Sequence, residues 1–114
     1  MFMLVEALIR PQKVEAVRTA LHEIGVKGIT ITEVRGSGRQ KGFTQHYRGV
    51  EYTISLIQKV KVEVVVVANE ARYVAETIAE AARTGEIGDG KIFLIPVGDT
   101  VRIRTGEEGR DALE

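Results

Sequence analysis

Apolar and polar residues follow two different periods along the chain, and the order of these periods predicts the secondary structure. Phe2–Ile9 is apolar except for Glu6 and predicts a strand. Pro11 favours the first turn of a helix, and apolar residues then recur at helical spacing as far as Gly25. The β-branched segment 28–35 predicts a second strand. The start of the chain therefore predicts a strand–helix–strand unit.

The second half of the chain predicts the same unit again. Residues 59–66 alternate cleanly, which places four valines on one face of a strand. A helix is predicted from a cap at Asn69 to Arg83, followed by a strand over Lys91–Val97 and a short fifth strand over 101–104. Two such units predict an α+β, ferredoxin-like βαββαβ fold, in which both helices cover one face of an antiparallel sheet.

A long polar segment, residues 37–55, joins the second and third predicted strands. Hairpin connections normally have about 2–5 residues, so a loop of this length is usually functional. Arg39, Lys41 and Arg48 are opposed only by Glu51. The composition favours an exposed regulatory loop that reaches a partner, covers a bound anion or receives a modification. A solvated insertion without a role is the alternative interpretation.

Residues 84–91 connect the second predicted helix to its strand and carry glycines at alternate positions. Gly88 and Gly90 allow the backbone to turn sharply and to direct N–H groups into one concavity, and Lys91 adds a cation. Such backbone nests bind phosphate. The alternative interpretation is an ordinary helix-to-strand turn.

Two arginines near the C-terminus strengthen the phosphate hypothesis. In a strand over 101–104, Arg102 and Arg104 occupy alternate positions, so both guanidiniums lie on one face. Paired guanidiniums suit the many oxygens of a polyphosphate. Taken together with Lys91, they favour a nucleotide polyphosphate over two solvated surface arginines.

Size and charge limit the classes of function. The 114 residues are enough for one domain (1–114), and 16 basic and 16 acidic residues give a formal net charge of +0. This balance argues against a general nucleic-acid or anionic-membrane binder. The chain has no cysteine for disulfides or thiolate metal sites, and no apolar run near the ~20 residues of a membrane span. We expect a soluble, cytoplasmic protein without membrane insertion.

Three segments together resemble the PII signal-transduction proteins, which are trimeric sensors of nitrogen, carbon and energy status. The segments are 38–52, 84–93 and 101–108, and they occur in the order and at the intervals of that family, after an Arg10-Pro11 start. The resemblance implies a homotrimer whose regulatory loop is 37–55, whose phosphate-binding turn is 84–91 and whose C-terminal segment is 101–114.

The resemblance also implies specific ligand sites. For ATP or ADP it implies Gly28, Thr30, Gly36, Gly38, Arg39, Glu63, Gly88, Asp89, Gly90, Lys91, Arg102 and Arg104, some of them across a subunit boundary. For 2-oxoglutarate it implies Arg10, Gln40 and Lys59, with Gln40 also helping to hold Mg²⁺ on the ATP. Mg²⁺ prefers oxygen ligands and needs few from protein when phosphates and carboxylates supply them. Tyr52 matches the position that many bacterial members have nucleotidylated.

We therefore expect a regulatory binding protein and not an enzyme. By resemblance, its targets include an ammonium transporter, a nucleotidyl transferase acting on glutamine synthetase, or a sensor kinase. One alternative is an RNA-binding module of the same topology, but such modules stack bases on aromatic residues, and residues 59–67 contain none. Another alternative is a weak ATPase, although no residue is placed obviously as a general base.

Overall fold

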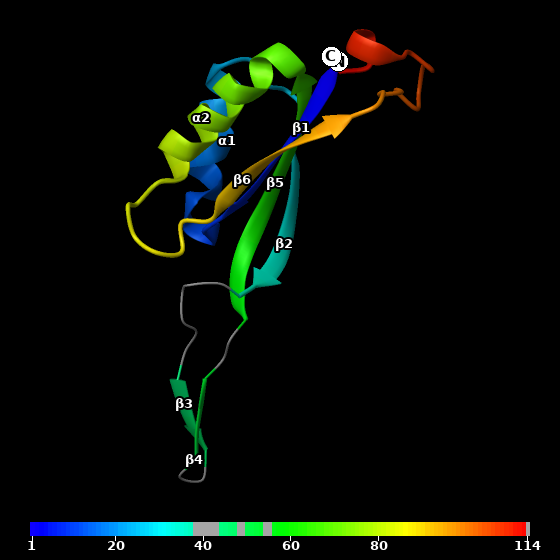
Figure 1. Ribbon diagram of the computed structural model, residues 1–114. Helices are drawn as coiled ribbons and strands as arrows, with labels where there is room; N and C mark the ends of the chain where they lie inside the picture. The colour runs from blue at the N-terminus through cyan, green and yellow to red at the C-terminus, as the bar shows by residue number, and fades with distance from the viewer. Residues whose placement is uncertain (38–43, 48–49, 54–55, 114) are drawn as a thin grey trace.

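The computed structural model describes residues 1–37, 44–47, 50–53 and 56–113, with the backbone alone for 44–47 and 50–53. Two helices lie on one face of a four-stranded sheet, and a separate two-stranded ribbon extends from its end (Figure 1). The strands are β1 (Phe2–Ile9), β2 (Thr30–Gly36), β3 (Thr44–Tyr47), β4 (Val50–Thr53), β5 (Ile57–Val67) and β6 (Lys91–Val97). The helices are α1 (Val14–Glu23) and α2 (Ala71–Ala82), with 3-10 turns η1 (Pro11–Lys13), η2 (Ala68–Glu70) and η3 (Gly109–Leu113).

The main sheet has the order β2-β5-β1-β6, and every neighbouring pair is antiparallel. This arrangement confirms the predicted ferredoxin-like α+β fold. The observed bounds of β1 and β6 coincide with the predicted ones, and α2 ends one residue before its predicted end at Arg83. Within the described residues, no helix is long and apolar enough to cross a membrane.

The core lies between the helices and one face of the sheet. Alternate side chains of the two central strands point into it, and α1 and α2 close it from the other side. Its members include Val5, Ala7 and Ile9 on β1, Val60, Val62, Val64 and Val66 on β5, Val17 and Leu21 on α1, and Val74 and Ile78 on α2. Fully burying a side chain of this size contributes about 1.5–3 kcal/mol, so this one face supplies most of the hydrophobic stabilisation.

The predicted cap at Asn69 is wrong. The chain passes directly from β5 into the 3-10 turn η2, so Asn69 lies inside that turn. The residue that precedes α2 is Glu70, and its side chain makes no capping hydrogen bond. A side chain caps a helix only from the position just before it, and the extra turn moves Asn69 away from that position.

The predicted fifth strand over 101–104 is also wrong. The segment forms one isolated bridge, between Val101 and Glu108, and then a turn. Backbone N–H groups of Arg102 and Gly106 donate to the carbonyls of Glu107 and Arg102, each at 2.8 Å. These local hydrogen bonds close the chain into a hook, and Gly106 has the positive φ of 76° that the hook requires. Arg102 and Arg104 are therefore not alternate positions of a strand.

Part of the predicted loop 37–55 pairs with itself. β3 and β4 form an antiparallel ladder in which Gln45 lies opposite Tyr52. The remaining positions 38–43, 48–49 and 54–55 lie outside the described residues. The ribbon extends away from the main sheet, beyond the ends of β2 and β5 (Figure 1).

The segment between α2 and β6 presses against the end of β1 at Gly90. A Cβ atom at this position would lie 1.7 Å from the carbonyl oxygen of Leu8, and Gly90 has a φ of 101°. Gly85, in the same segment, has a φ of 91°, but a Cβ atom there would meet nothing within 4 Å. Both positions favour glycine for their backbone conformation, and Gly90 requires it for space as well.

We expect Gly90→Ala to destabilise the protein much more than Gly85→Ala. Each change introduces backbone strain of about 1–3 kcal/mol, and Gly90→Ala adds a clash with the backbone of β1 that no side-chain movement relieves. Urea unfolding at one fixed protein concentration measures both free energies. Equal losses in the two variants would show that the segment moves away from β1 without cost.

Candidate functional site

The glycine turn, residues 84–91, is closed by the carboxylate of Asp89. Its Oδ2 accepts hydrogen bonds from the backbone N–H groups of Thr84 and Gly85, both at 2.9 Å. Its Oδ1 accepts from the Thr84 hydroxyl at 2.5 Å and from Nε of Arg10 at 3.1 Å. These contacts join the beginning and the end of the turn, and Arg10 connects the turn to the chain just after β1.

These donors change the acidity of Asp89. The hydrogen bonds from the Thr84 hydroxyl and backbone, helped by Gly85 and Arg10, hold the pKa of this carboxyl well below its usual range, although desolvation acts in the opposite direction. Asp89 is therefore a carboxylate at every pH near neutrality, and its negative charge faces donors of its own turn and the guanidinium of Arg10.

Two cations hold carbonyl groups of the same turn. Nη2 of Arg10 donates to the carbonyl of Ile87 at 2.9 Å, and Nζ of Lys59 donates to the carbonyl of Gly88. Burial lowers the pKa of Lys59, and the nearby Arg10 lowers it further, while Asp89 raises it. The positive φ of Gly88, 105°, lets the backbone present these carbonyls to the cations.

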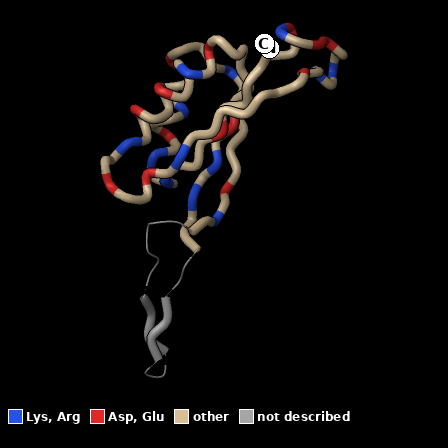
Figure 2. Tube along the Cα trace, in the orientation of Figure 1, with Lys and Arg blue, Asp and Glu red and all other residues tan. Residues whose placement is uncertain are grey.

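A cavity of about 650 Å³ lies beside the turn. It is lined by residues from the turn, from both central strands and from the two edge strands, including Leu8, Gly36, Lys59, Gly88, Asp89, Gly90, Lys91 and Phe93. Basic positions gather at this end of the sheet, from which the ribbon extends (Figure 2). The structure therefore brings together six of the predicted ligand residues, and Arg10 contacts the turn that forms one wall.

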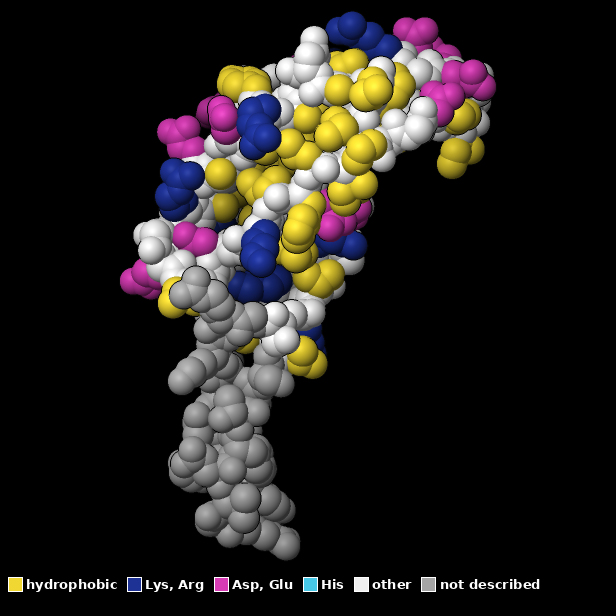
Figure 3. Space-filling model, viewed as in Figure 1, with side chains coloured by type: hydrophobic (Ala, Val, Ile, Leu, Met, Phe, Trp, Pro, Cys, Tyr) yellow, Lys and Arg dark blue, Asp and Glu magenta, His cyan; other side chains and the backbone are white. Residues whose placement is uncertain are grey.

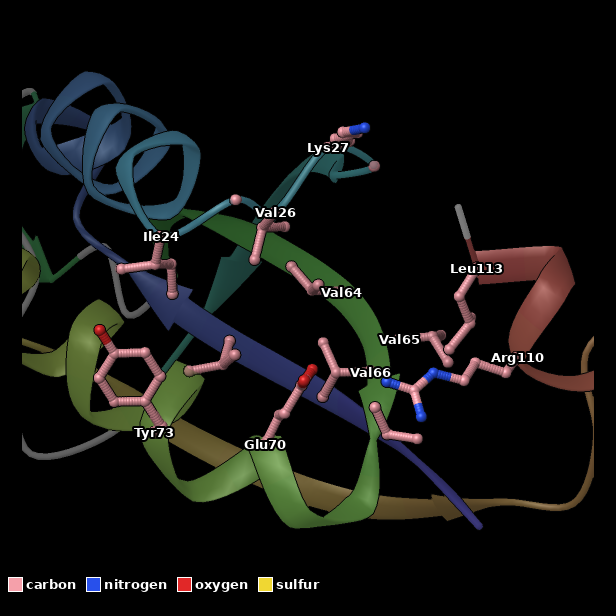
Figure 4. A pocket seen from close by; sticks show the side chains of 14 residues that line it. Ile24, Val26, Lys27, Val64, Val65, Val66, Glu70, Tyr73, Arg110 and Leu113 are labelled. Carbon is pink, nitrogen blue, oxygen red and sulfur yellow. The ribbon is translucent and has the colours of Figure 1, made fainter.

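Other predicted nucleotide residues lie elsewhere in the chain. Gly28 lines a second hollow of about 520 Å³, at the other end of the sheet, where β5 ends and β2 has not yet begun. Figure 4 shows the side chains around it, with Glu70 and Arg110 on different elements and valines of β5 between them. Thr30 and Glu63 lie opposite each other on β2 and β5, on the sheet face that the helices leave open.

The two C-terminal arginines lie far from Lys91 within one chain. Lys91 begins β6, whereas Arg102 and Arg104 follow the other end of this 7-residue strand, a separation of about 20 Å along the sheet. Nη1 of Arg102 pairs with Oε1 of Glu107 at 2.9 Å, and its Nη2 donates to the carbonyl of Asp111 at 3.1 Å. β6 therefore holds Lys91 apart from this pair within one chain, and a nucleotide site that contains all three residues stays a prediction that would need a second copy of the chain.

Several predicted residues cannot be placed. Gly38, Arg39 and Gln40 lie outside the described residues, and of Tyr52 only the backbone position on β4 is described. Among the residues that are described, no group of three or more His, Asp or Glu side chains could hold a metal ion. The predicted Mg²⁺ site, which depends on Gln40 and on ligand oxygens, therefore stays a prediction.

Sequence reasoning missed Thr84 and Glu107. Thr84 donates to Asp89 from both its backbone and its hydroxyl, and Glu107 pairs with Arg102. Thr and Asp are residue types whose side chains hydrogen-bond nearby groups in turns, so their presence at the two ends of this turn was a detectable signal. Glu107 carried none, because its contact depends on the hook that replaces the predicted strand.

Comparison with known proteins gives consistent results. Residues 2–107 match the family model described as nitrogen regulatory protein P-II. The nitrogen regulatory protein P-II of Azospirillum brasilense is 55% identical over 109 residues, covering 96% of this chain and 97% of the relative. That of Microchaete diplosiphon is 57% identical with the same coverage. The crystal structure of Arabidopsis thaliana PII bound to citrate is 45% identical, with a TM-score of 0.80 over 97% of this chain and 91% of that one.

The match extends over nearly the whole chain, includes the glycine turn and the start of the C-terminal hook, and is accompanied by the same fold in a solved relative. The chain belongs to the P-II family of nitrogen regulatory proteins.

Proposed function

We propose that this protein is a cytoplasmic sensor of nitrogen, carbon and energy status that binds ATP or ADP, binds 2-oxoglutarate together with Mg-ATP, and regulates target proteins through loop 37–55. The observation that carries the proposal is the glycine turn beside a 650 Å³ cavity, with Lys91 in the cavity wall and two cations, Arg10 and Lys59, against the turn. Membership in the P-II family supports the regulatory role.

The nucleotide phosphates would bind at the glycine turn. Gly88, Asp89, Gly90 and Lys91 border the cavity, and a glycine-rich backbone with an adjacent lysine suits phosphate oxygens. The side chain of Lys91 is exposed at the start of β6. Residues proposed for the remainder of the nucleotide are Gly28, Thr30, Gly36, Gly38, Arg39 and Glu63.

A complete nucleotide site would need more than one copy of the chain. Gly28 and the two C-terminal arginines are separated from the glycine turn by the sheet itself, so neighbouring copies would bring them to it. The open face of the sheet offers a surface for this association, since Leu4 and Ile95 lie side by side on it and Phe93 is 43% exposed. Hydrophobic side chains gather along the middle of the sheet, whereas charged ones lie over the helices, at the lower end of the sheet and on the C-terminal segment (Figure 3). A closed homotrimer would cover this face.

The 2-oxoglutarate site would lie in the same cavity, close to the nucleotide phosphates. Lys59 offers a cation for the distal carboxylate, while Gln40 and Mg²⁺ on the ATP would hold the keto-acid end. The related Arabidopsis thaliana protein was crystallised with citrate, which is also a small polycarboxylate. Arg10 would contribute positive charge to this end of the cavity.

The output would be a change in loop 37–55. The loop extends from the end of the sheet that holds the cavity, so its root and the proposed ligands share one location. Ligand binding that favours one arrangement of the loop changes its affinity for partners, which is thermodynamic linkage. Targets would include an ammonium transporter, a nucleotidyl transferase acting on glutamine synthetase, or a sensor kinase, and Tyr52 would be available for nucleotidylation.

We expect Lys91→Ala and Arg104→Ala each to weaken ATP binding by about 1.5–3 kcal/mol, the usual range for a hydrogen bond to a charged group. Arg104 is the better test of the arginine pair, because Arg102 also holds the hook through Glu107. Isothermal titration calorimetry measures the affinities. Arg72→Ala, at an exposed position on α2, is the matched control and should bind ATP normally. Normal affinity in both site variants would contradict the proposed nucleotide site.

We expect 2-oxoglutarate to bind only when ATP and Mg²⁺ are both present, because the described chain offers no metal cluster of its own. Lys59→Met should abolish this binding while weakening ATP binding far less, because Arg10 still holds the turn at Ile87. Lys59→Arg should retain part of the 2-oxoglutarate binding, since the positive charge remains. Calorimetric titration of 2-oxoglutarate with and without EDTA tests both statements. Tight binding in EDTA without nucleotide would refute the mechanism.

We expect Ile95→Glu to convert the trimer into monomers. The side chain is 40% exposed on the open face, so a carboxylate there would be buried without a partner on association. Size-exclusion chromatography with light scattering gives the mass. Tyr73→Glu, at an exposed aromatic residue on α2, is the control and should remain trimeric. A trimer in both variants would place the interface on another surface.

A further inference from the structure

The hook near the C-terminus presents an apolar side chain to solvent. Ile103, in its turn, is 100% exposed, the highest value among the large apolar residues that the structure describes. It stands between Arg102 and Arg104, which the proposed nucleotide site takes from a neighbouring copy. We propose that Ile103 anchors the hook on the next copy of the chain, at the apolar mouth of the cavity beside the glycine turn, and thereby holds Arg104 at the phosphates. This inference rests on the proposed nucleotide site and names the contact that would assemble it.

Hydrogen bonds within the hook fix its shape before any association. The backbone N–H of Arg102 donates to the carbonyl of Glu107, and that of Gly106 donates to the carbonyl of Arg102, each at 2.8 Å. The Thr105 hydroxyl donates to Oε1 of Glu107 at 2.8 Å. The hook projects beyond the end of β6 (Figure 1). Because these bonds hold the turn in place, Ile103 stays away from the core of its own chain and loses little conformational entropy when it contacts a second surface.

The two arginines beside Ile103 have different surroundings. Arg102 is held in the hook by Oε1 of Glu107 at 2.9 Å and by the carbonyl of Asp111 at 3.1 Å. Arg104 is exposed and makes no hydrogen bond or ion pair within the described residues. Its guanidinium donors are therefore available for phosphate oxygens. Docking of the adjacent Ile103 would fix the backbone from which Arg104 extends.

Apolar side chains surround the cavity beside the glycine turn. Leu8, Ile57, Ile87 and Phe93 line it, and the last two are 58% and 43% exposed. Ile87 belongs to the turn itself, and Phe93 lies on the same face of β6 as Lys91. A side chain that contacts both Ile87 and Phe93 is therefore close to the groups proposed to bind phosphate.

The distance along β6 requires that the hook at this mouth comes from a second copy of the chain. Within one chain, the 7-residue strand separates the hook from the cavity by about 20 Å. The mouth carries Lys59 and Lys91 and the hook carries two arginines, so the two surfaces repel each other until a polyphosphate lies between them. In the free protein the apolar contact of Ile103 would supply the attraction, and the phosphates of ATP would add to it.

The first test is cross-linking between copies. The chain has no cysteine, so introduced cysteines report a single contact. A variant with both Ile103→Cys and Ile87→Cys, treated with a short bismaleimide, should give covalent trimers on a denaturing gel, because each copy carries one member of the pair for each neighbour. The matched control joins Ile103→Cys with Tyr73→Cys, at an exposed position on α2, and should give no covalent trimers.

The second test measures what the anchor contributes. Ile103→Ser should raise the dissociation constant of the trimer about tenfold or more in sedimentation velocity, since the burial of an isoleucine side chain is lost at each contact. Where the trimer persists, calorimetry should show ATP binding about tenfold weaker, and Arg104→Ala in the same chain should add little to this loss. Ile103→Leu should retain both properties, because the volume of the side chain is kept. Tyr73→Ser is the control for exposed apolar positions, and circular dichroism establishes that each variant is folded.

The outcomes separate this inference from the proposed function. Failure of the unmodified protein to bind ATP or to form trimers would overturn the proposed nucleotide site and this inference with it. Normal trimers and normal ATP binding in Ile103→Ser, with ATP binding still weakened by Arg104→Ala, would overturn this inference alone. Covalent dimers from Ile103→Cys by itself would place two hooks against each other and would also overturn it, as would the loss of a target protein as the only effect of Ile103→Ser.

Discussion

The antiparallel pairing of β1 with β5 is the constraint on which the rest of the structure depends. These strands are the two central members of the sheet, and their register places Val5 opposite Val64 and Ala7 opposite Val62 on one face. Burial of that face against α1 and α2 fixes which side chains point away from the helices. The same pairing fixes where the chain leaves the sheet, and so determines the positions of the glycine turn, the ribbon and the C-terminal hook.

The charged side chains at the glycine turn are arranged so that backbone N–H groups are the groups proposed to bind phosphate. Asp89 is compensated by donors of its own turn and by Arg10, while Arg10 and Lys59 also hold neighbouring carbonyls. In a trans peptide group the N–H points away from the carbonyl, so a cation that holds the carbonyl directs the N–H of that peptide group to the opposite side. A turn organised in this way before ligand binding loses less conformational entropy when an anion arrives. The close approach of Gly90 to β1 adds steric support to the same arrangement.

The distribution of predicted ligand residues gives the proposed association a physical role. Lys91 lies at one end of β6 and Arg104 beyond the other, and Gly28 lies near the opposite edge of the sheet. No rotation of side chains joins groups that a sheet holds apart. If neighbouring copies complete each site, nucleotide binding and trimer stability are linked. A nucleotide bound at one glycine turn then also contacts the neighbouring copy of the chain. The open face of the sheet would then contribute to ligand binding as well as to association.

The sequence by itself determined the order of the two helices and of the four strands of the main sheet, the fold class and the family, because strict alternation in residues 59–66 and helical spacing after Pro11 are local properties that tertiary packing reinforces. It also identified the glycine turn as the candidate phosphate-binding element from its composition. Only the tertiary structure decided that residues 101–104 form a hook, since backbone hydrogen bonds within 100–109 outcompete an edge strand there. The hydrogen bond from Arg10 to Asp89 was also visible only in the tertiary structure, because a contact between residues 79 positions apart does not affect local periodicity.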